Sequence, residues 1–376
     1  MKQMEEANEI LSTLNKEGFH AYIVGGAVRD FLLNRRSADI DIVTSAQPDE
    51  IRSLFPKTIQ MNTEHQTVIV RLNSQLYEVT TFRGDSLQQD LFERDLTINS
   101  MAMDVEGNLI DPANGEKDLQ GRYLRSVDPV KTMTDDPLRM LRVARFVSEL
   151  GFAVDEDLMK VIYSNHSILH SVAVERVAKE WLKLFKGIHR QSAFKLLINS
   201  SMYESIPGLT LDKDVLNKLS RLDIDQDETD VVCWTVYCLV LNVDNANILK
   251  CLALSSQLIR DVNKRLVGYW LRTEQLWTNL SLYDTTIQVA KDIEYIRSLL
   301  GEAAYKGTEL EQIWGLIPIH SRSELAITGR DLLNETNKQS GPWIKDELRA
   351  AEEAVVTNNC ENEKECLLEW LERRRK

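Results

Sequence analysis

The chain has 376 residues, 43% hydrophobic and 27% charged, which is the balance of a globular protein with two or three domains. Its 45 basic and 58 acidic residues give a net charge of −13, which excludes nucleic-acid binding through overall positive charge but not through a local basic groove. Five cysteines without a C-x-x-C pair argue against a disulfide framework or structural zinc. The polar start and the lack of an apolar run of about 20 residues predict a cytoplasmic protein.

The first third of the chain mixes strand and helix patterns. Hydrophobic side chains recur at helical spacing in residues 5–16 and 27–33. Short runs of strand character occupy residues 21–24, 39–43, 67–72, 75–82 and 108–111. These patterns predict an α+β domain with a small mixed β-sheet.

Helical patterns dominate after about residue 126, where the strand signals stop. Residues 137–150 predict a strong helix, with Asp136 before a proline at the first helical position and Gly151 closing the last turn. Residues 155–165 and 172–186 repeat the helical period. The rest of the chain is helix after helix, so the sequence predicts an α+β head on a long helical body.

A diglycine turn follows the first strand, in Gly25-Gly-Ala-Val-Arg-Asp-Phe-Leu-Leu33. Glycines at the start of a helix let the backbone N–H groups approach a phosphate, and Arg29 can add a charge-assisted contact. No Gly-Lys-Ser/Thr follows, so this is not a Walker loop. The simpler interpretation is a tight turn without a ligand.

Asp39 and Asp41 lie two residues apart in the next predicted strand, so both carboxylates face the same side. Close carboxylates repel unless a cation neutralises them, and hard oxygen ligands suit Mg²⁺. The alternative is a solvated face of an edge strand. Glu78 in the 75–82 strand is a candidate third catalytic carboxylate, or else an exposed strand residue.

In their order along the chain, these and later blocks resemble the motifs of class II tRNA nucleotidyltransferases, the CCA-adding family. The resemblance to motif A lies in Gly25–Leu33 with Asp39–Thr44. The later blocks resemble motif B (Glu93–Ala102), motif C (Asp111–Leu119 with Leu124 and Arg125), motif D (Asp135–Arg139 with Arg142, Arg145 and Phe146) and motif E (Val174–Glu180). Leu325–Asp331 and Gly341–Trp343 are similar to the tail of bacterial members. The resemblance covers nearly the whole chain.

The resemblance implies a four-part architecture: a mixed-sheet nucleotidyltransferase head (1–125), then an all-α neck for base recognition (126–190), body (191–265) and tail (266–376) that bind tRNA. It implies transfer of a nucleotidyl group from CTP or ATP to the 3′ end of tRNA without a template. Asp39 and Asp41 would hold Mg²⁺ for that transfer.

Further site residues follow from the same resemblance. Gly25, Gly26 and Arg29 would cradle the triphosphate, Arg94, Asp95 and Asn99 would contact the sugar, Asp136 and Arg139 would read the base, and Arg142 and Arg145 would extend the basic stripe. From the residues alone, Asp95 and Asp136 are also candidate helix caps, and Arg142 and Arg145 can pair with acids instead of phosphates. The family more often has a basic residue at Glu93 and a glutamate at Asp135.

The connector between the 75–82 strand and Glu93 distinguishes members of the family. It contains only Arg83–Phe92, whereas complete CCA-adding relatives carry a longer flexible segment associated with switching from CTP to ATP. The short connector predicts an enzyme that adds two cytidines, with complete CCA addition as the alternative. An A-adding enzyme, a poly(A) polymerase and a noncatalytic RNA-binding protein are less favoured.

Overall fold

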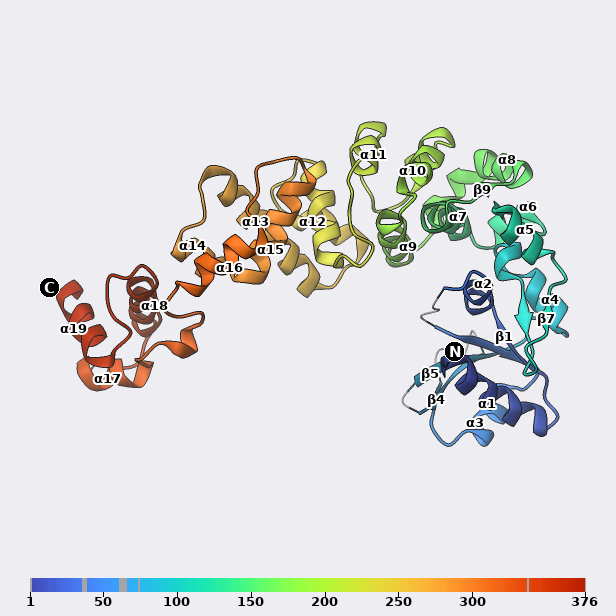
Figure 1. The fold of residues 1–376 in the computed structure, drawn as a ribbon, viewed down its shortest axis with the longest axis horizontal. Coiled ribbons are helices and arrows are strands. Elements are labelled where there is room, and N and C mark those ends of the chain that lie inside the picture. Colours follow the sequence, from blue (N-terminus) through green and yellow to red (C-terminus); the bar gives the residue numbers. More distant parts are fainter. Residues whose placement is uncertain (1, 36–38, 61–65, 74, 337, 376) are drawn as a thin grey trace. The chain divides into compact units, whose positions relative to one another are not determined.

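The computed structural model describes residues 2–35, 39–60, 66–73, 75–336 and 338–375 (Figure 1). The chain divides into two compact units, Met1–Ser220 and Arg221–Lys376. Each unit buries its own set of hydrophobic side chains. The predicted boundaries at residues 125, 190 and 265 stay predictions.

A mixed β-sheet organises the head. Among the described residues its strand order is β3-β4-β5-β2-β1-β6-β7. The strands are β1 (Ala21–Val24), β2 (Asp41–Thr44), β3 (Thr58–Gln60), β4 (Thr67–Leu72), β5 (Gln75–Thr81), β6 (Ala102–Met103) and β7 (Leu109–Ile110). The two central pairings set the site, because antiparallel β1 places Val24 opposite Asp41 and parallel β5 places Glu78 on its other side.

Short helices cover and connect these strands. They are α1 (Lys2–Lys16), α2 (Gly26–Leu32), α3 (Pro48–Leu54), α4 (Leu87–Phe92) and α5 (Gly115–Gly121), with a 3₁₀ turn η2 (Thr97–Asn99). Ile10, Leu11 and Leu14 form the buried stripe of α1, which packs on β1 and β2, as its helical spacing predicts. The helix α4 lies inside the connector and was not predicted.

The remainder of the first unit is built around one buried helix. Its elements are β8 (Tyr123–Leu124), α6 (Pro129–Asp135), α7 (Leu138–Leu150), β9 (Ala153–Val154), α8 (Glu156–Asn165), η3 (His166–Ser171), α9 (Val174–Lys186), α10 (Arg190–Asn199), η4 (Met202–Ser205) and α11 (Lys213–Ser220). The helix α7 buries residues on almost every side because α9 and α10 both pack against it.

Two details of this region differ from the prediction. Strand pairing does not stop at residue 126, since β9 pairs in parallel with β8; a two-residue strand is too short to leave a periodic pattern. The helix α7 begins one residue later than predicted, since Pro137 holds its N-cap position, but the side chain of Asp136 still accepts from the backbone N–H of Leu138 (3.3 Å), as a capping residue does. Gly151 closes α7 with a φ of 70°, as predicted.

Helices are the only regular secondary structure among the described residues of the second unit, as predicted. Its elements are α12 (Asp230–Val240), η5 (Ala246–Leu252), α13 (Ser256–Glu274), α14 (Asn279–Thr285), α15 (Ile287–Leu299), α16 (Gly307–Gly315), η6 (Arg322–Glu324), α17 (Gly329–Thr336), α18 (Trp343–Val356) and α19 (Lys364–Arg375). Glu294 is 2% exposed and accepts hydrogen bonds from Arg272 (2.7 Å), Trp277 (2.6 Å) and the backbone of Tyr305 (2.7 Å). No helix among the described residues is long and apolar enough to cross a membrane.

Candidate active site

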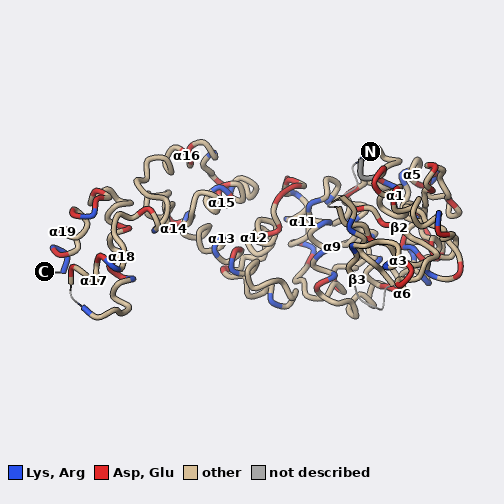
Figure 2. The backbone as a smooth tube through the Cα atoms, turned by 90° about the horizontal axis from the view of Figure 1, so that it is seen from below, with Lys and Arg blue, Asp and Glu red and all other residues tan. Residues whose placement is uncertain are grey.

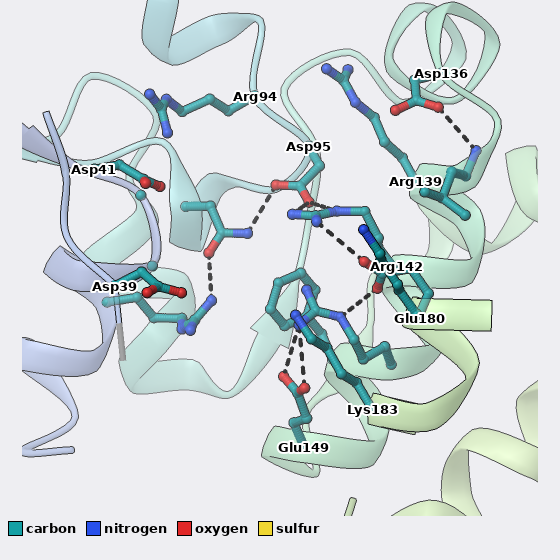
Figure 3. A pocket seen from close by; sticks show the side chains of 18 of the residues that line it. Asp39, Asp41, Arg94, Asp95, Asp136, Arg139, Arg142, Glu149, Glu180 and Lys183 are labelled. Atoms are coloured by element: carbon teal, nitrogen blue, oxygen red, sulfur yellow. Dashed lines mark hydrogen bonds and ion pairs between the residues drawn. The ribbon is translucent and has the colours of Figure 1, made fainter. Parts of the chain in front are cut away.

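A cavity of about 890 Å³ opens in the first unit, between the diglycine turn and the helices α7 and α9 (Figure 3). Every predicted site residue except Glu78 lines it: Gly25, Gly26, Arg29, Asp39, Asp41, Arg94, Asp95, Asn99, Asp136, Arg139, Arg142 and Arg145. These residues span more than a hundred positions of the sequence. The fold therefore gathers motifs A, B and D around one cavity.

The diglycine turn needs glycine for two reasons. Gly25 has a φ of 71°, a conformation that other residues rarely adopt. A methyl group at Gly25 would also lie 2.9 Å from Nη1 of Arg94 and 3.7 Å from Oδ2 of Asp41. The turn thus brings the backbone, the guanidinium of Arg94 and the carboxylate of Asp41 together at the residue that precedes α2.

The carboxylates of Asp39 and Asp41 lie on the same side of the cavity (Figure 3). Strand β2 begins at Asp41, so Asp39 precedes the strand instead of belonging to it. Burial raises the pKa of Asp41; the Arg94 charge opposes this effect and the Asp39 charge adds to it. Mutual repulsion between two carboxylates is the condition that a bound cation relieves.

Glu78 lies in register with Asp41 but does not line the cavity. Burial raises its pKa, and the charges of Asp41 and Asp39 raise it further. In the described part of the chain, the only three-residue group of carboxylate, thiol or imidazole donors within 4.8 Å of one another is Glu361, Glu363 and Cys366. Glu78 therefore experiences the charge of Asp41 but does not contribute to the cavity wall in this conformation.

A chain of polar contacts crosses the cavity from α2 to α9. Arg29 donates to Asn99 (2.8 Å), and Asn99 donates to Asp95 (2.9 Å). Arg142 donates to the other oxygen of Asp95 (2.7 Å) and lies 3.6 Å from Glu180. The sugar-side and phosphate-side residues predicted from the sequence are thus parts of one network.

Asp95 is the buried centre of that network. Its burial opposes ionisation, but the Arg142 charge and hydrogen bonds from Asn99 and Arg142 outweigh this cost and hold the pKa of Asp95 at about 2. Its alternative role as a helix cap is not observed, because Leu96 holds the N-cap position of η2. Asp95 instead accepts from the backbone N–H of Leu96 at 2.9 Å.

The two predicted base readers already have partners. Both carboxylate oxygens of Asp136 accept from Arg176, at 3.1 and 2.7 Å. Arg139 donates to the backbone carbonyl of Glu93 at 2.9 Å. Both side chains are therefore held in defined orientations by contacts within the protein.

The predicted phosphate contacts Arg142 and Arg145 pair with acids, the alternative drawn from the sequence. Arg145 lies 2.7 Å from Glu180 and 3.2 Å from Glu149, and its guanidinium stacks 4.1 Å from the centre of the Phe146 ring. Both arginines also line the cavity. Each retains N–H groups that can meet a phosphate.

Sequence reasoning missed several residues of the cavity wall: Asp30, Arg83, Glu149, Arg176, Lys179, Glu180 and Lys183. Four of them follow one face of α9 at steps of three and four residues, which is a readable signal. Arg83 carried no such signal, because it depends on where β5 ends.

Comparisons with known proteins identify the family of the chain. Residues 21–125 match the Poly A polymerase head domain, residues 151–212 the probable RNA and SrmB-binding site of polymerase A, and residues 226–371 the putative tRNA nucleotidyltransferase domain 2. The chain is 41% identical over 371 residues to a CC-adding tRNA nucleotidyltransferase of Halalkalibacterium halodurans, covering 97% of this chain and 96% of that protein.

Complete CCA-adding enzymes are also similar. One from Bacillus cereus is 35% identical over 393 residues, covering 99% of both chains. The crystal structure of the Bacillus stearothermophilus CCA-adding enzyme in complex with CTP has a TM-score of 0.88 and 34% identity, covering 99% of this chain and 97% of that one. The chain therefore belongs to the class II tRNA nucleotidyltransferases, the CCA-adding family. It is a tRNA nucleotidyltransferase of the CC- or CCA-adding type.

Proposed function

We propose that this enzyme transfers CMP from CTP to the 3′ end of a tRNA that lacks its CCA end, adds two cytidines and stops. The observation that carries the proposal is the short connector between β5 and Glu93. A pocket that must accept a second base needs a part that moves, and a short, folded connector leaves little chain for such movement.

The connector is folded on itself. Ser86 caps α4 by accepting from the backbone N–H of Gln89 (3.3 Å), and the side chain of Gln89 accepts from the backbone of Asp85 (2.6 Å). Asp90 is buried and bonds to the backbone of Arg83 (3.1 Å). These contacts favour a rigid brace over a flexible lever.

The end of the connector also touches a base reader. The carbonyl of Glu93 accepts from Arg139, and the side chain of Glu93 pairs with Lys131 on α6. A carboxylate at Asp136 suits the exocyclic amino group of cytosine, and the Arg139 guanidinium suits its ring acceptors. Holding Arg139 in one direction favours one base shape.

The relatives give further support. The similarity to CC-adding enzymes is higher, at 41% and 40% identity, than the 35% of the CCA-adding enzymes. The match to the Bacillus cereus enzyme extends over 393 positions, more than the 376 residues of this chain, so that enzyme has residues without a counterpart here.

The proposed reaction is an in-line phosphoryl transfer. The 3′ oxygen of the tRNA forms a bond to the α-phosphorus of CTP, the bond from that phosphorus to the bridging oxygen breaks, pyrophosphate leaves, and the hydroxyl proton passes to solvent. The backbone N–H of Gly26, at the start of α2, and the side chain of Arg29 bind the phosphates, while the N–H of Gly25 donates to the carbonyl of Met101 at 3.3 Å. The contact from Asn99 to Asp95 fixes the wall against which the sugar lies.

The head fits Mg²⁺ as its metal. Asp39 and Asp41 supply hard oxygen donors, and burial, with a smaller contribution from the Asp39 charge, raises the pKa of Asp41. When bound, the metal activates the 3′-OH and stabilises the leaving pyrophosphate. The two aspartates would hold it.

The proposed tRNA substrate binds to the helical part of the chain, which recognises the shape of the RNA backbone. Figure 2 shows basic residues interspersed with acidic ones in both units, which fits local phosphate contacts on an acidic protein. We expect tRNA affinity to fall as salt concentration rises.

Complete CCA addition is the second candidate. The TM-score of 0.88 to the Bacillus stearothermophilus CCA-adding enzyme favours it, because a nearly identical fold serves that activity. In that case the short connector would be sufficient for the switch to ATP.

The test uses tRNA trimmed of its CCA end, Mg²⁺, and CTP alone, ATP alone or both, with products sized at single-nucleotide resolution. We expect two additions with CTP and no third with both. Three additions with both would establish the complete activity, and ATP-only addition would indicate an A-adding enzyme. Asp39→Ala should abolish addition, whereas the exposed Asp157→Ala serves as the matched control.

A further inference from the structure

Asp90 links the two ends of the connector through hydrogen bonds to its carboxylate. Its side chain is 1% exposed, yet it lies in a short surface helix. One oxygen accepts from the backbone N–H of Arg83, the first residue of the connector, at 3.1 Å. The other accepts from Nε and Nη2 of Arg94, just beyond the connector, at 3.1 and 3.0 Å. One carboxylate thus joins both ends.

This fork determines where the rest of Arg94 points. Two of its nitrogens are held by Asp90, and in the described residues Nη1 makes no hydrogen bond, so its N–H groups face the cavity. Nη1 is also the atom that a methyl group on Gly25 would approach to 2.9 Å. Figure 3 shows Arg94 on the same side of the cavity as Asp39 and Asp41.

Water cannot replace Arg94 as the partner of the buried Asp90 carboxylate without a cost in stability. A buried carboxylate without its guanidinium would be costly, and an arginine without a fixed partner samples several rotamers. A guanidinium that is already oriented loses less entropy when an anionic ligand binds. The pairing therefore prepares Arg94 for a ligand on the side of Gly25.

We propose that Asp90 is a positioning residue that holds Arg94 against the diglycine turn, where Nη1 meets the bound nucleoside triphosphate. The inference rests on the proposed function only in taking that ligand to be the nucleotide substrate. It applies equally to CC and to CCA addition, because it concerns binding of the triphosphate and not the choice of the final base.

The experiment measures the Kd of CTP calorimetrically with Mg²⁺ and without tRNA. Asp90→Asn keeps the shape of the side chain and removes its charge, and we expect the Kd to rise about tenfold. Asp85→Asn is the matched control, since Asp85 is an exposed aspartate in the same connector. Its Kd should equal that of the wild type.

A double-mutant cycle distinguishes an effect of Asp90 that acts through Arg94 from a structural effect that is independent of Arg94. If Asp90 acts through Arg94, the variant Asp90→Asn/Arg94→Gln binds CTP as weakly as Arg94→Gln alone. Independent, multiplying effects would overturn the proposal, as would an unchanged Kd in a folded Asp90→Asn variant. Melting temperatures establish folding.

A second variant covers the case in which Asp90→Asn does not fold. Arg94→Lys keeps the positive charge but cannot form the two-nitrogen fork on Asp90. A Kd raised to a similar degree supports the proposal, and a wild-type Kd overturns it. The CTP-binding measurement contains no tRNA, so it does not depend on how many nucleotides the enzyme adds. Addition of three nucleotides in the primer assay would contradict CC-only addition and would leave the result for Asp90 unchanged.

Discussion

Replacing Asp95 by Asn tests whether the network across the cavity is held by charge. The substitution keeps the size of the side chain and removes the negative charge that faces Arg142. Asn99 and the backbone of Leu96 can still donate to an amide oxygen. The stabilisation lost in Asp95→Asn therefore comes mainly from the ion pair with the Arg142 guanidinium.

The magnitude follows from the pKa of Asp95. The folded protein holds it at about 2, against an ordinary value of 3.8. A depressed pKa of a carboxyl group stabilises the fold above the unfolded value, and the gap corresponds to about 2 kcal/mol at neutral pH. This contribution disappears as pH falls from about 4 toward about 2. Asp95→Asn should therefore destabilise the first unit by about 2 kcal/mol at pH 7.

The measurement is urea-induced unfolding of the full chain at several pH values between 7 and 3. We expect the difference in free energy between wild type and Asp95→Asn to be constant from pH 7 to pH 5 and to shrink below about pH 4. A difference that stays the same down to pH 3 would refute the reasoning, because the lost interaction would then not depend on ionisation. Exposed Asp157→Asn is the control at neutral pH.

Three further predictions address the chemistry and the second unit. Asp41→Asn should abolish nucleotide addition without lowering the melting temperature in metal-free buffer, since burial raises the pKa of Asp41 and ionisation costs stability at neutral pH; a lower melting temperature would contradict this. Arg176→Ala removes the ion-pair partner of Asp136 and should reduce the preference for CTP over ATP about threefold in a competition assay; unchanged preference would show that Arg176 does not orient the base reader. Glu294→Gln leaves Arg272 buried without its charge partner and should destabilise the second unit by about 3 kcal/mol in calorimetric unfolding, whereas an unaltered transition would show that the pair is dispensable.

Local patterns in the sequence were sufficient for the elements that carry the site. The strand at residues 21–24 and the helix that follows Gly25 are where periodicity predicts them. Gly25 itself has the positive φ that a diglycine turn suggests. The neighbourhood of Asp39 and Asp41 was readable because two residues at this spacing share one side of a strand or its approach.

Interactions between distant residues were not readable in this way. The sequence did not predict α4 inside the connector, and neither β9 nor the end of α6 at Asp135 follows from periodicity. The contact between Arg139 and a carbonyl of Glu93 depends on a backbone atom, which no residue type reveals.

The sequence by itself determined which chemical groups the site contains and the order in which they occur along the chain, because side-chain chemistry and hydrophobic period are local properties. Only the tertiary structure decided which groups meet. Arg29, Asn99, Asp95, Arg142 and Glu180 form one network although they come from four separate segments. Their contacts exist because the packing of α7 against α9 and the pairing of β1 with β6 bring those segments within hydrogen-bond distance.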